Sequence, residues 1–134
     1  MATKNTLLFY PTVFLTEDDG QITVRVPDVG VATMGADYQD AIAMAQEAVG
    51  LALEEETSYP DPSTPLDVTL EEWESPENVQ VMIVAYDLAE YRRHVSKTVR
   101  RNISIPEYLN NIAKKNNINV SKVATEALEE IVFG

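Results

Sequence analysis

Carboxylates are the most abundant groups in this sequence that could do chemistry, with 22 Asp and Glu residues against 10 Lys and Arg residues. Hydrolysis with two metal ions needs several carboxylates that converge at a sheet. The two most strand-like segments, residues 7–15 and 79–86, contain none. Asp28, Glu47 and Asp87 lie at the ends of predicted elements or on a helix, so they would converge only by chance. We therefore predict no catalytic residue, no metal site and no cofactor, and keep a metal-dependent nuclease only as an alternative.

The other residue types that carry catalysis are scarce. His94 is the single histidine, and no second partner is suggested near it, which is typical of a linker residue rather than of a general base. The absence of cysteine excludes disulfides and thiolate metal sites. No run reaches the roughly 18 apolar residues of a membrane span, and the first residues do not form a signal peptide. We expect a soluble, cytoplasmic protein.

Residues 98–106, with the sequence TVRRNISIP, form the one segment where basic and amide side chains alternate with apolar ones. Such an alternation predicts a strand with two different faces. Pro106 ends the strand, and no second strand follows to pair with it, so we expect its partner to come from another copy of the chain. The two faces are Val99, Arg101, Ile103 and Ile105 on one side and Thr98, Arg100, Asn102 and Ser104 on the other.

Charge is divided unequally along the chain, whose formal net charge is −12. Residues 1–95 carry four basic and 18 acidic side chains, a net charge of −14, whereas residues 96–134 carry six basic and four acidic ones, a net charge of +2. The asymmetry suggests two tasks. The acidic part would repel nucleic acid and attract a basic partner, or its charge would serve only solubility. We predict two domains with these limits, 1–95 and 96–134.

The elements of the first domain follow from turn signals and periodicity. Residues 6–15 and 22–26 predict two strands joined by an Asp-Gly turn, and residues 31–34 predict a short third strand. Pro11 suggests that the first strand is an edge or carries a bulge, and such an edge could make a tetramer. An amphipathic helix begins after Asp37 as N-cap. The apolar run 79–86 predicts a buried central strand that returns parallel to an earlier one by a right-handed crossover.

Two segments connect these elements to each other and to the second domain. Residues 57–78 contain four prolines and predict a long surface loop, in which residues 69–72 have capping-box spacing for one helical turn. Trp73 follows that turn, either as a partner-binding anchor or, as we expect, packed over the core of its own domain. Residues 87–95 predict a short helix with Leu88 and Tyr91 toward the core and the residues Arg92, Arg93 and His94 exposed.

The second domain continues with two helices. Pro106 suits the first position of the first one, which presents Leu109, Ile112 and Ala113. Asn119 is the expected N-cap of the second helix, whose apolar stripe includes Val123 and Leu128. A strand and two helices in fewer than 40 residues cannot bury a core alone, so we expect two copies to pair their strands across a two-fold axis.

This strand-helix-helix order resembles the ribbon-helix-helix family of DNA-binding proteins over residues 97–134. The resemblance implies that Arg100, Asn102 and Ser104 of a two-stranded intermolecular ribbon contact base edges. It also implies that the free N–H groups of Asn119, Val120 and Ser121 hold a phosphate. Arg101 takes an inward position that is usually apolar, so it either splays the ribbon or reaches phosphates. The implied dimer core is Ile103, Ile105, Leu109, Val123 and Leu128.

The whole chain resembles the HicB family of antitoxins. The motifs are V-P-D at residues 26–28, G-A-D-Y at 35–38, A-x-x-x-A-x-E-A at 41–48, D-L-x-x-Y at 87–91 and R-N-I-S-I-P at 101–106. The resemblance implies an α+β protein whose β-β-β-α-β first domain is a partial ribonuclease-H-like fold.

That domain would bind a small basic mRNA-cleaving toxin of the HicA type, and the ribbon-helix-helix dimer would bind operator DNA and repress its own operon. A repressor of the same class that responds to a small ligand is the other alternative.

Overall fold

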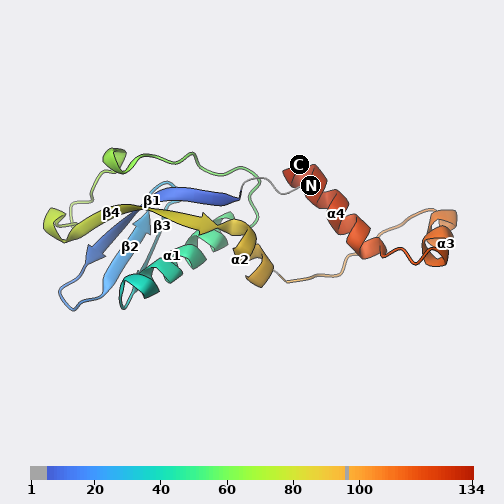
Figure 1. Cartoon of the computed structure of the whole chain (residues 1–134), viewed down its shortest axis with the longest axis horizontal. Coiled ribbons are helices and arrows are strands. Elements are labelled where there is room, and N and C mark those ends of the chain that lie inside the picture. Colours follow the sequence, from blue (N-terminus) through green and yellow to red (C-terminus); the bar gives the residue numbers. More distant parts are fainter. Residues whose placement is uncertain (1–5, 96) are drawn as a thin grey trace. The chain divides into compact units, whose positions relative to one another are not determined.

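A computed structural model places residues 6–95 and 97–134. The chain divides into two compact units, one of Thr6–Ser96 and one that contains Lys97–Gly134. The described residues form one four-stranded antiparallel sheet and four α-helices, so the fold is of the α+β class (Figure 1). None of the described helices has the length and apolar character that crossing a membrane requires.

The sheet of the first unit contains β1 (Leu7–Thr16), β2 (Ile22–Val26), β3 (Val31–Gly35) and β4 (Val79–Asp87), in the spatial order β3-β2-β1-β4. The predicted hairpin between β1 and β2 is confirmed. Its turn is closed by the Glu17 amide, which donates to the Gln21 carbonyl at 2.8 Å, and by Gly20, whose φ of +90° lies in the left-handed region that glycine favours.

The last strand does not pair as predicted. β4 pairs with β1 and runs antiparallel to it, so the prediction that β4 pairs in parallel with an earlier strand is wrong. β4 does run in the same direction as β2, but the two strands are not neighbours. The position is also wrong, because β4 lies at an edge and most of its residues are exposed or half-buried. Residues 57–78 lengthen the connection after the helix, which frees the chain to enter the sheet from either end. An apolar run indicates that a segment forms a strand, but it does not indicate whether the strand lies at the centre or at the edge of the sheet.

Pro11 is accommodated without an edge strand or a bulge. β1 lies inside the sheet, which corrects the prediction that its edge is exposed and could make a tetramer. Its register with β4 advances one residue at a time from Leu7 to Leu15. β2 pairs only with Val13 to Thr16 of β1, so at Pro11 the strand has a neighbour on one side only and needs fewer backbone donors.

One face of the sheet is covered by α1 (Tyr38–Leu53). Asp37 is its N-cap as predicted, and the side chain accepts a hydrogen bond from the Asp40 amide at 2.8 Å. Gly35 of the G-A-D-Y motif is required here, because a Cβ atom would overlap the backbone of Ala41. The core between α1 and the sheet contains Tyr10, Phe14, Ile22, Val24, Val26, Ala41, Ala45, Val49, Leu53, Tyr86 and Leu88.

The D-L-x-x-Y motif forms the start of α2 (Leu88–Val95). The Asp87 carboxylate accepts from the Glu90 amide at 3.0 Å, Leu88 is buried, and Tyr91 packs so closely on α1 that a Cβ at Gly50 would overlap its ring. Arg92 is half-buried, which corrects its predicted exposure. Its guanidinium donates to the carbonyl of Glu54 at 2.9 and 3.1 Å, so it binds the negative end of α1.

The second unit contains α3 (Glu107–Lys115) and α4 (Val120–Phe133). Pro106 is the N-cap of α3 rather than its first residue, a shift of one position. Asn116 is the C-cap of α3, and Asn117 follows it with a φ of +56°. Asn119 is the N-cap of α4 as predicted, with its side chain accepting from the Lys122 amide at 3.1 Å. None of the residues 97–134 is buried in a single copy of the chain, and residues 97–106 lie outside helices and strands.

Candidate partner-binding surfaces

The two faces of the sheet can be assigned from the strand register. Paired residues of neighbouring strands share a face, and successive residues alternate. The hydroxyl of Tyr38 in α1 donates to Gln80 Oε1 at 3.3 Å, so Gln80 and the residue opposite it, Phe14, face α1. The odd-numbered residues of β1 and β4 therefore lie on the opposite face, called here the outer face.

The loop of residues 57–78 covers the part of the outer face along β2 and the adjoining part of β1. It passes on the side of the sheet away from α1 (Figure 1). Arg25 of β2 binds the loop, because its Nε and one terminal nitrogen donate to the Glu74 carboxylate at 2.6 and 2.7 Å, and the same nitrogen donates to the Thr69 carbonyl at 2.9 Å. Beneath this pair Val13 is fully buried.

The Arg25–Glu74 ion pair is shielded from water, with side chains 12% and 1% exposed. Hydrogen bonding to Arg25 lowers the pKa of Glu74, and the same bond raises the pKa of Arg25. Glu74 also accepts from the Glu71 amide at 2.8 Å. The carboxylate is thus fully satisfied, which is the condition under which a buried charge is tolerated.

Trp73 is displayed on the surface by this arrangement. Its side chain is 58% exposed, so the prediction that it packs over the core is wrong. The predicted helical turn is also absent from this part of the loop; a turn closed by the Glu74 amide and the Glu71 carbonyl at 3.0 Å takes its place. Glu74 points inward to Arg25, and its neighbour Trp73 is left outside.

The part of the outer face formed by the first residues of β1 and the last residues of β4 is apolar and exposed to solvent. Phe9 of β1 is 49% exposed and Ile83 of β4 is 58% exposed. They are diagonal neighbours, because Phe9 pairs with Ala85 and Ile83 pairs with Pro11. Leu66, in the short 3₁₀ helix Pro65–Asp67 near β4, is also exposed. We call the apolar surface of the sheet the outer patch; its members are Leu7, Phe9, Ile83 and Ala85.

The free edge of β4 borders the outer patch. In the described sheet β4 pairs only with β1, over nine successive residues without a bulge. Its sequence, VQVMIVAYD, contains no lysine, arginine, proline or glycine. Natural proteins usually protect an exposed edge strand with such residues, with a bulge or with a covering element. The opposite edge, β3, is only five residues long and is packed against α1.

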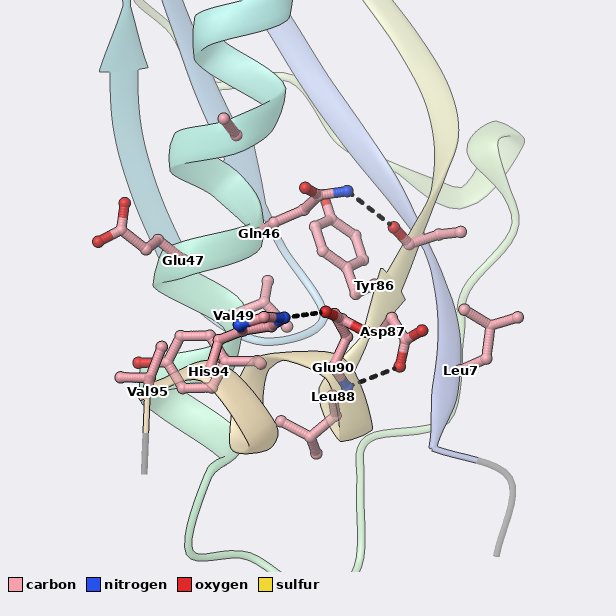
Figure 2. A pocket seen from close by; sticks show the side chains of 14 residues that line it. Leu7, Gln46, Glu47, Val49, Tyr86, Asp87, Leu88, Glu90, His94 and Val95 are labelled. Atoms are coloured by element: carbon pink, nitrogen blue, oxygen red, sulfur yellow. Dashed lines mark hydrogen bonds and ion pairs between the residues drawn. The ribbon is translucent and has the colours of Figure 1, made fainter. Parts of the chain in front are cut away.

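A pocket of about 510 Å³ opens at the end of this edge, between α1, the last residues of β4 and α2 (Figure 2). Val49, Tyr86 and Leu88 form an apolar floor. Burial raises the pKa of Tyr86, whose hydroxyl hydrogen-bonds Thr12 at 2.6 Å. Exposed carboxylates surround the opening, from Glu47, Asp87 and Glu90.

His94 lies at the same opening and pairs with Glu90 one helical turn earlier (Figure 2). The expectation that no partner lies near His94 is therefore corrected. Arg93 also pairs with Glu90, and its hydrogen bond is the main reason that the pKa of Glu90 is lowered. This cluster is exposed, and ion pairs in solvent contribute little to stability.

Of the three carboxylates considered for metal chemistry, Glu47 and Asp87 line the same pocket, whereas Asp28 belongs to the turn after β2. Asp28 accepts from the amide and the hydroxyl of Ser63 at 2.8 and 2.7 Å, Asp87 accepts from the Glu90 amide, and Glu47 lies at the pocket. Among the described residues, no three Asp, Glu or His side chains form a group that could hold a metal ion. Asp28 instead ties the loop to the turn after β2.

The residues predicted to contact DNA and to form the dimer core all belong to the second unit. Arg100, Asn102 and Ser104, predicted for bases, and Arg101, Asn119 and Ser121, predicted for phosphates, are exposed, and Val120 is half-buried at the first turn of α4. In one copy of the chain the structure does not test these roles, and they stay predictions. The predicted core residues are likewise exposed: Ile103, Ile105, Leu109, Val123 and Leu128.

The sequence reasoning missed the outer patch, the free edge of β4 and the pocket. The apolar run of β4 is compatible both with an edge strand that a partner covers and with the buried central strand that was predicted. The Arg25–Glu74 pair had no signal in the sequence, because 49 residues separate its members.

A family match and a similar solved structure each cover most of the chain. Residues 10–129 match a family described as HicB-like antitoxin of bacterial toxin–antitoxin system. A chain in a solved toxin–antitoxin complex from Streptococcus pneumoniae is similar in structure, with a TM-score of 0.54 and 24% sequence identity, over 91% of this chain and 97% of that chain. At this identity the likeness concerns the fold. A comparison with curated proteins found no match.

Proposed function

The chain belongs to the HicB-like antitoxin family of bacterial toxin–antitoxin systems, and we propose that it neutralises a small basic mRNA-cleaving toxin of the HicA type through residues 1–95 and represses its own operon through residues 96–134. The division of charge is the observation that carries the proposal. An acidic unit can compete with RNA phosphates for the basic groove of a ribonuclease.

The arginines of the first unit strengthen this charge argument. Arg25 is bound by Glu74, Arg92 by carbonyls at the end of α1, and Arg93 by Glu90. The cations of the described part of this unit are thus occupied internally, whereas many carboxylates face solvent. Such a surface favours a basic protein as partner and disfavours nucleic acid.

The second unit supports a dimeric DNA-binding role. Its apolar side chains are exposed in one copy, and residues 97–106 have the alternation of a strand, so a second copy would supply both a core and a strand partner. The ribbon so formed would direct Arg100, Asn102 and Ser104 toward bases. Arg and Asn can each make bidentate contacts to a base edge, and this unit has the net positive charge that phosphates require.

Toxin binding is tested by pull-down from the native host with the intact chain. We expect recovery of a small basic protein encoded beside this gene, and retention of that protein by residues 1–95 alone. Purified chain should abolish the ribonuclease activity of that protein. Recovery of further copies of this chain only, with no basic protein, would contradict the proposal.

DNA binding is tested by titrating operator DNA with the variants Arg100→Ala and Asn102→Ala. Each should lose about 1 to 3 kcal/mol of specific binding, because a bidentate base contact is removed, while toxin binding stays unchanged. Lys114→Ala in the last turn of α3 lies outside the predicted contacts and serves as the charge-matched control. Equal loss of both functions would reduce the ribbon to a dimerisation device.

A ligand-responsive repressor is the second candidate, and the pocket is the observation that favours it. Its apolar floor and acidic opening would suit a small organic cation. Operator binding that changes with spermidine and not with the neighbouring basic protein would favour this candidate over the antitoxin.

A further inference from the structure

The strand β4 has the features of an edge that is completed by another molecule. Nine residues run in unbroken register with β1, and in an antiparallel pair alternate residues direct their N–H and C=O groups away from the partner strand. No basic residue, proline or glycine interrupts this edge. At Ala85 the strand is already contacted by α1, because the Ala85 carbonyl accepts a hydrogen bond from Gln46 Nε2 at 3.4 Å. The rest of such an edge is a template for strand addition.

The outer patch would complete such a contact. Phe9, Ile83 and Ala85 lie on the sheet face immediately beside the edge, and none of them is buried. A strand that pairs with β4 would place every second side chain next to these residues, where apolar groups would be buried together. Backbone pairing would supply affinity, and the patch would supply selectivity.

Charge identifies the occupant. Carboxylates flank the edge at both ends, from Glu77 just before β4, from Asp87 at its last position and from Glu90 after it, and all are exposed. Two copies of the chain pairing their β4 edges would bring together two copies of residues 1–95, each with a net charge of −14. A basic protein is attracted by the same field, so charge favours it over a second copy.

We propose that the basic toxin docks on the β4 edge and the outer patch, with an extended segment of the toxin pairing along β4 and basic side chains beside Glu77, Asp87 and Glu90. This assignment rests on the proposed function and adds to it the surface and the mode of recognition.

The first test compares Ile83→Lys with Met34→Lys in the intact chain. Both positions lie on the outer face of an edge strand, at 58% and 48% exposure, so both variants should fold. Ile83→Lys should weaken binding of the neighbouring basic protein by at least about 30-fold, because it adds a repelling charge at the centre of the contact. Met34→Lys should change affinity by less than about threefold.

The second test uses hydrogen exchange of the wild-type chain with and without that protein. Alternate amides of β4 should exchange rapidly in the free chain and become protected in the complex. Unchanged affinity in Ile83→Lys would overturn the docking surface, and so would protection confined to the Trp73 loop. A loss of higher oligomers in Ile83→Lys at unchanged toxin affinity would assign the edge to a second copy instead. If the wild-type chain does not bind the basic protein at all, the proposed function itself fails.

Discussion

The two units of this chain treat similar apolar content in opposite ways. The unit Thr6–Ser96 encloses Phe14, Val24 and Val49 between a sheet and a helix. In the unit containing Lys97–Gly134, helices with equally regular apolar stripes leave Val123 and Leu128 in solvent. The difference shows that a periodic apolar stripe predicts a buried face but not which chain buries it. In the first unit the sheet and the helix bury each other's apolar side chains. In the second unit these side chains remain exposed in one copy of the chain.

Polar groups differ between the units in the same sense. In the first unit Arg25 is paired within the fold, and the Asp37 carboxylate caps α1. In the second unit Arg100, Arg101 and Asn102 lie exposed on an extended segment. Polar side chains that the fold has satisfied stabilise it, whereas those left in solvent are available to a partner.

The largest effect should come from truncating an apolar side chain of the proposed dimer core. Leu128→Ala should lower the free energy of unfolding by about 2 to 5 kcal/mol per protomer and weaken the proposed dimer, because a second copy would bury this side chain. Leu51→Ala on α1 is the control, since Leu51 is also an exposed helical leucine and should change stability by no more than about 0.5 kcal/mol. Analytical ultracentrifugation and urea unfolding at several protein concentrations measure both. Equal effects of the two variants would remove the contrast between the units.

A somewhat smaller effect is expected inside the first unit. Glu74→Gln leaves Arg25 shielded without its counter-charge, so the free energy of unfolding at pH 7 should fall by about 3 kcal/mol, independently of protein concentration. The pKa of Glu74 is lowered in the folded state, so its contribution is present above the ordinary value of 4.5 and is lost as the pH falls through the lowered value.

Urea unfolding of wild type and Glu74→Gln at pH 7 and at successively lower pH checks this sign. The difference between the two proteins should shrink on the acid side. A difference that stays constant or grows there would mean that the carboxylate is not the stabilising group.

The smallest effect compares two helix caps of the same geometry. Asp37→Ala and Asn119→Ala each remove a side-chain acceptor at an N-cap, and each should cost about 1 kcal/mol. The two losses should differ in one respect: only that of Asn119→Ala should depend on protein concentration, because α4 belongs to the proposed dimer. Unfolding followed by circular dichroism at two concentrations separates them.

Much of the local structure could be predicted from the residues. The Asp-Gly turn, the caps at Asp37 and Asn119, and the packing of Leu88 and Tyr91 are confirmed, because each depends on contacts within a few residues or on a regular period. The position of β4, the exposure of Trp73 and the role of Arg92 were predicted wrongly. Each depends on contacts between segments far apart in the sequence, and the periodicity of one segment does not indicate such contacts.

The sequence by itself determined the four strands and the helix of the first unit, the two helices of the second unit and the division of charge, since these follow from side-chain type and spacing. The pairing of residues 98–105 with a second copy stays a prediction. Only the tertiary structure decided that β4 lies at an edge, that the loop bound through the Arg25–Glu74 pair covers part of the outer face, and that Phe9 and Ile83 stay exposed on the same face. The physical reason is that strand order and loop placement depend on how the whole unit buries its apolar surface. A pattern within one segment does not contain that information.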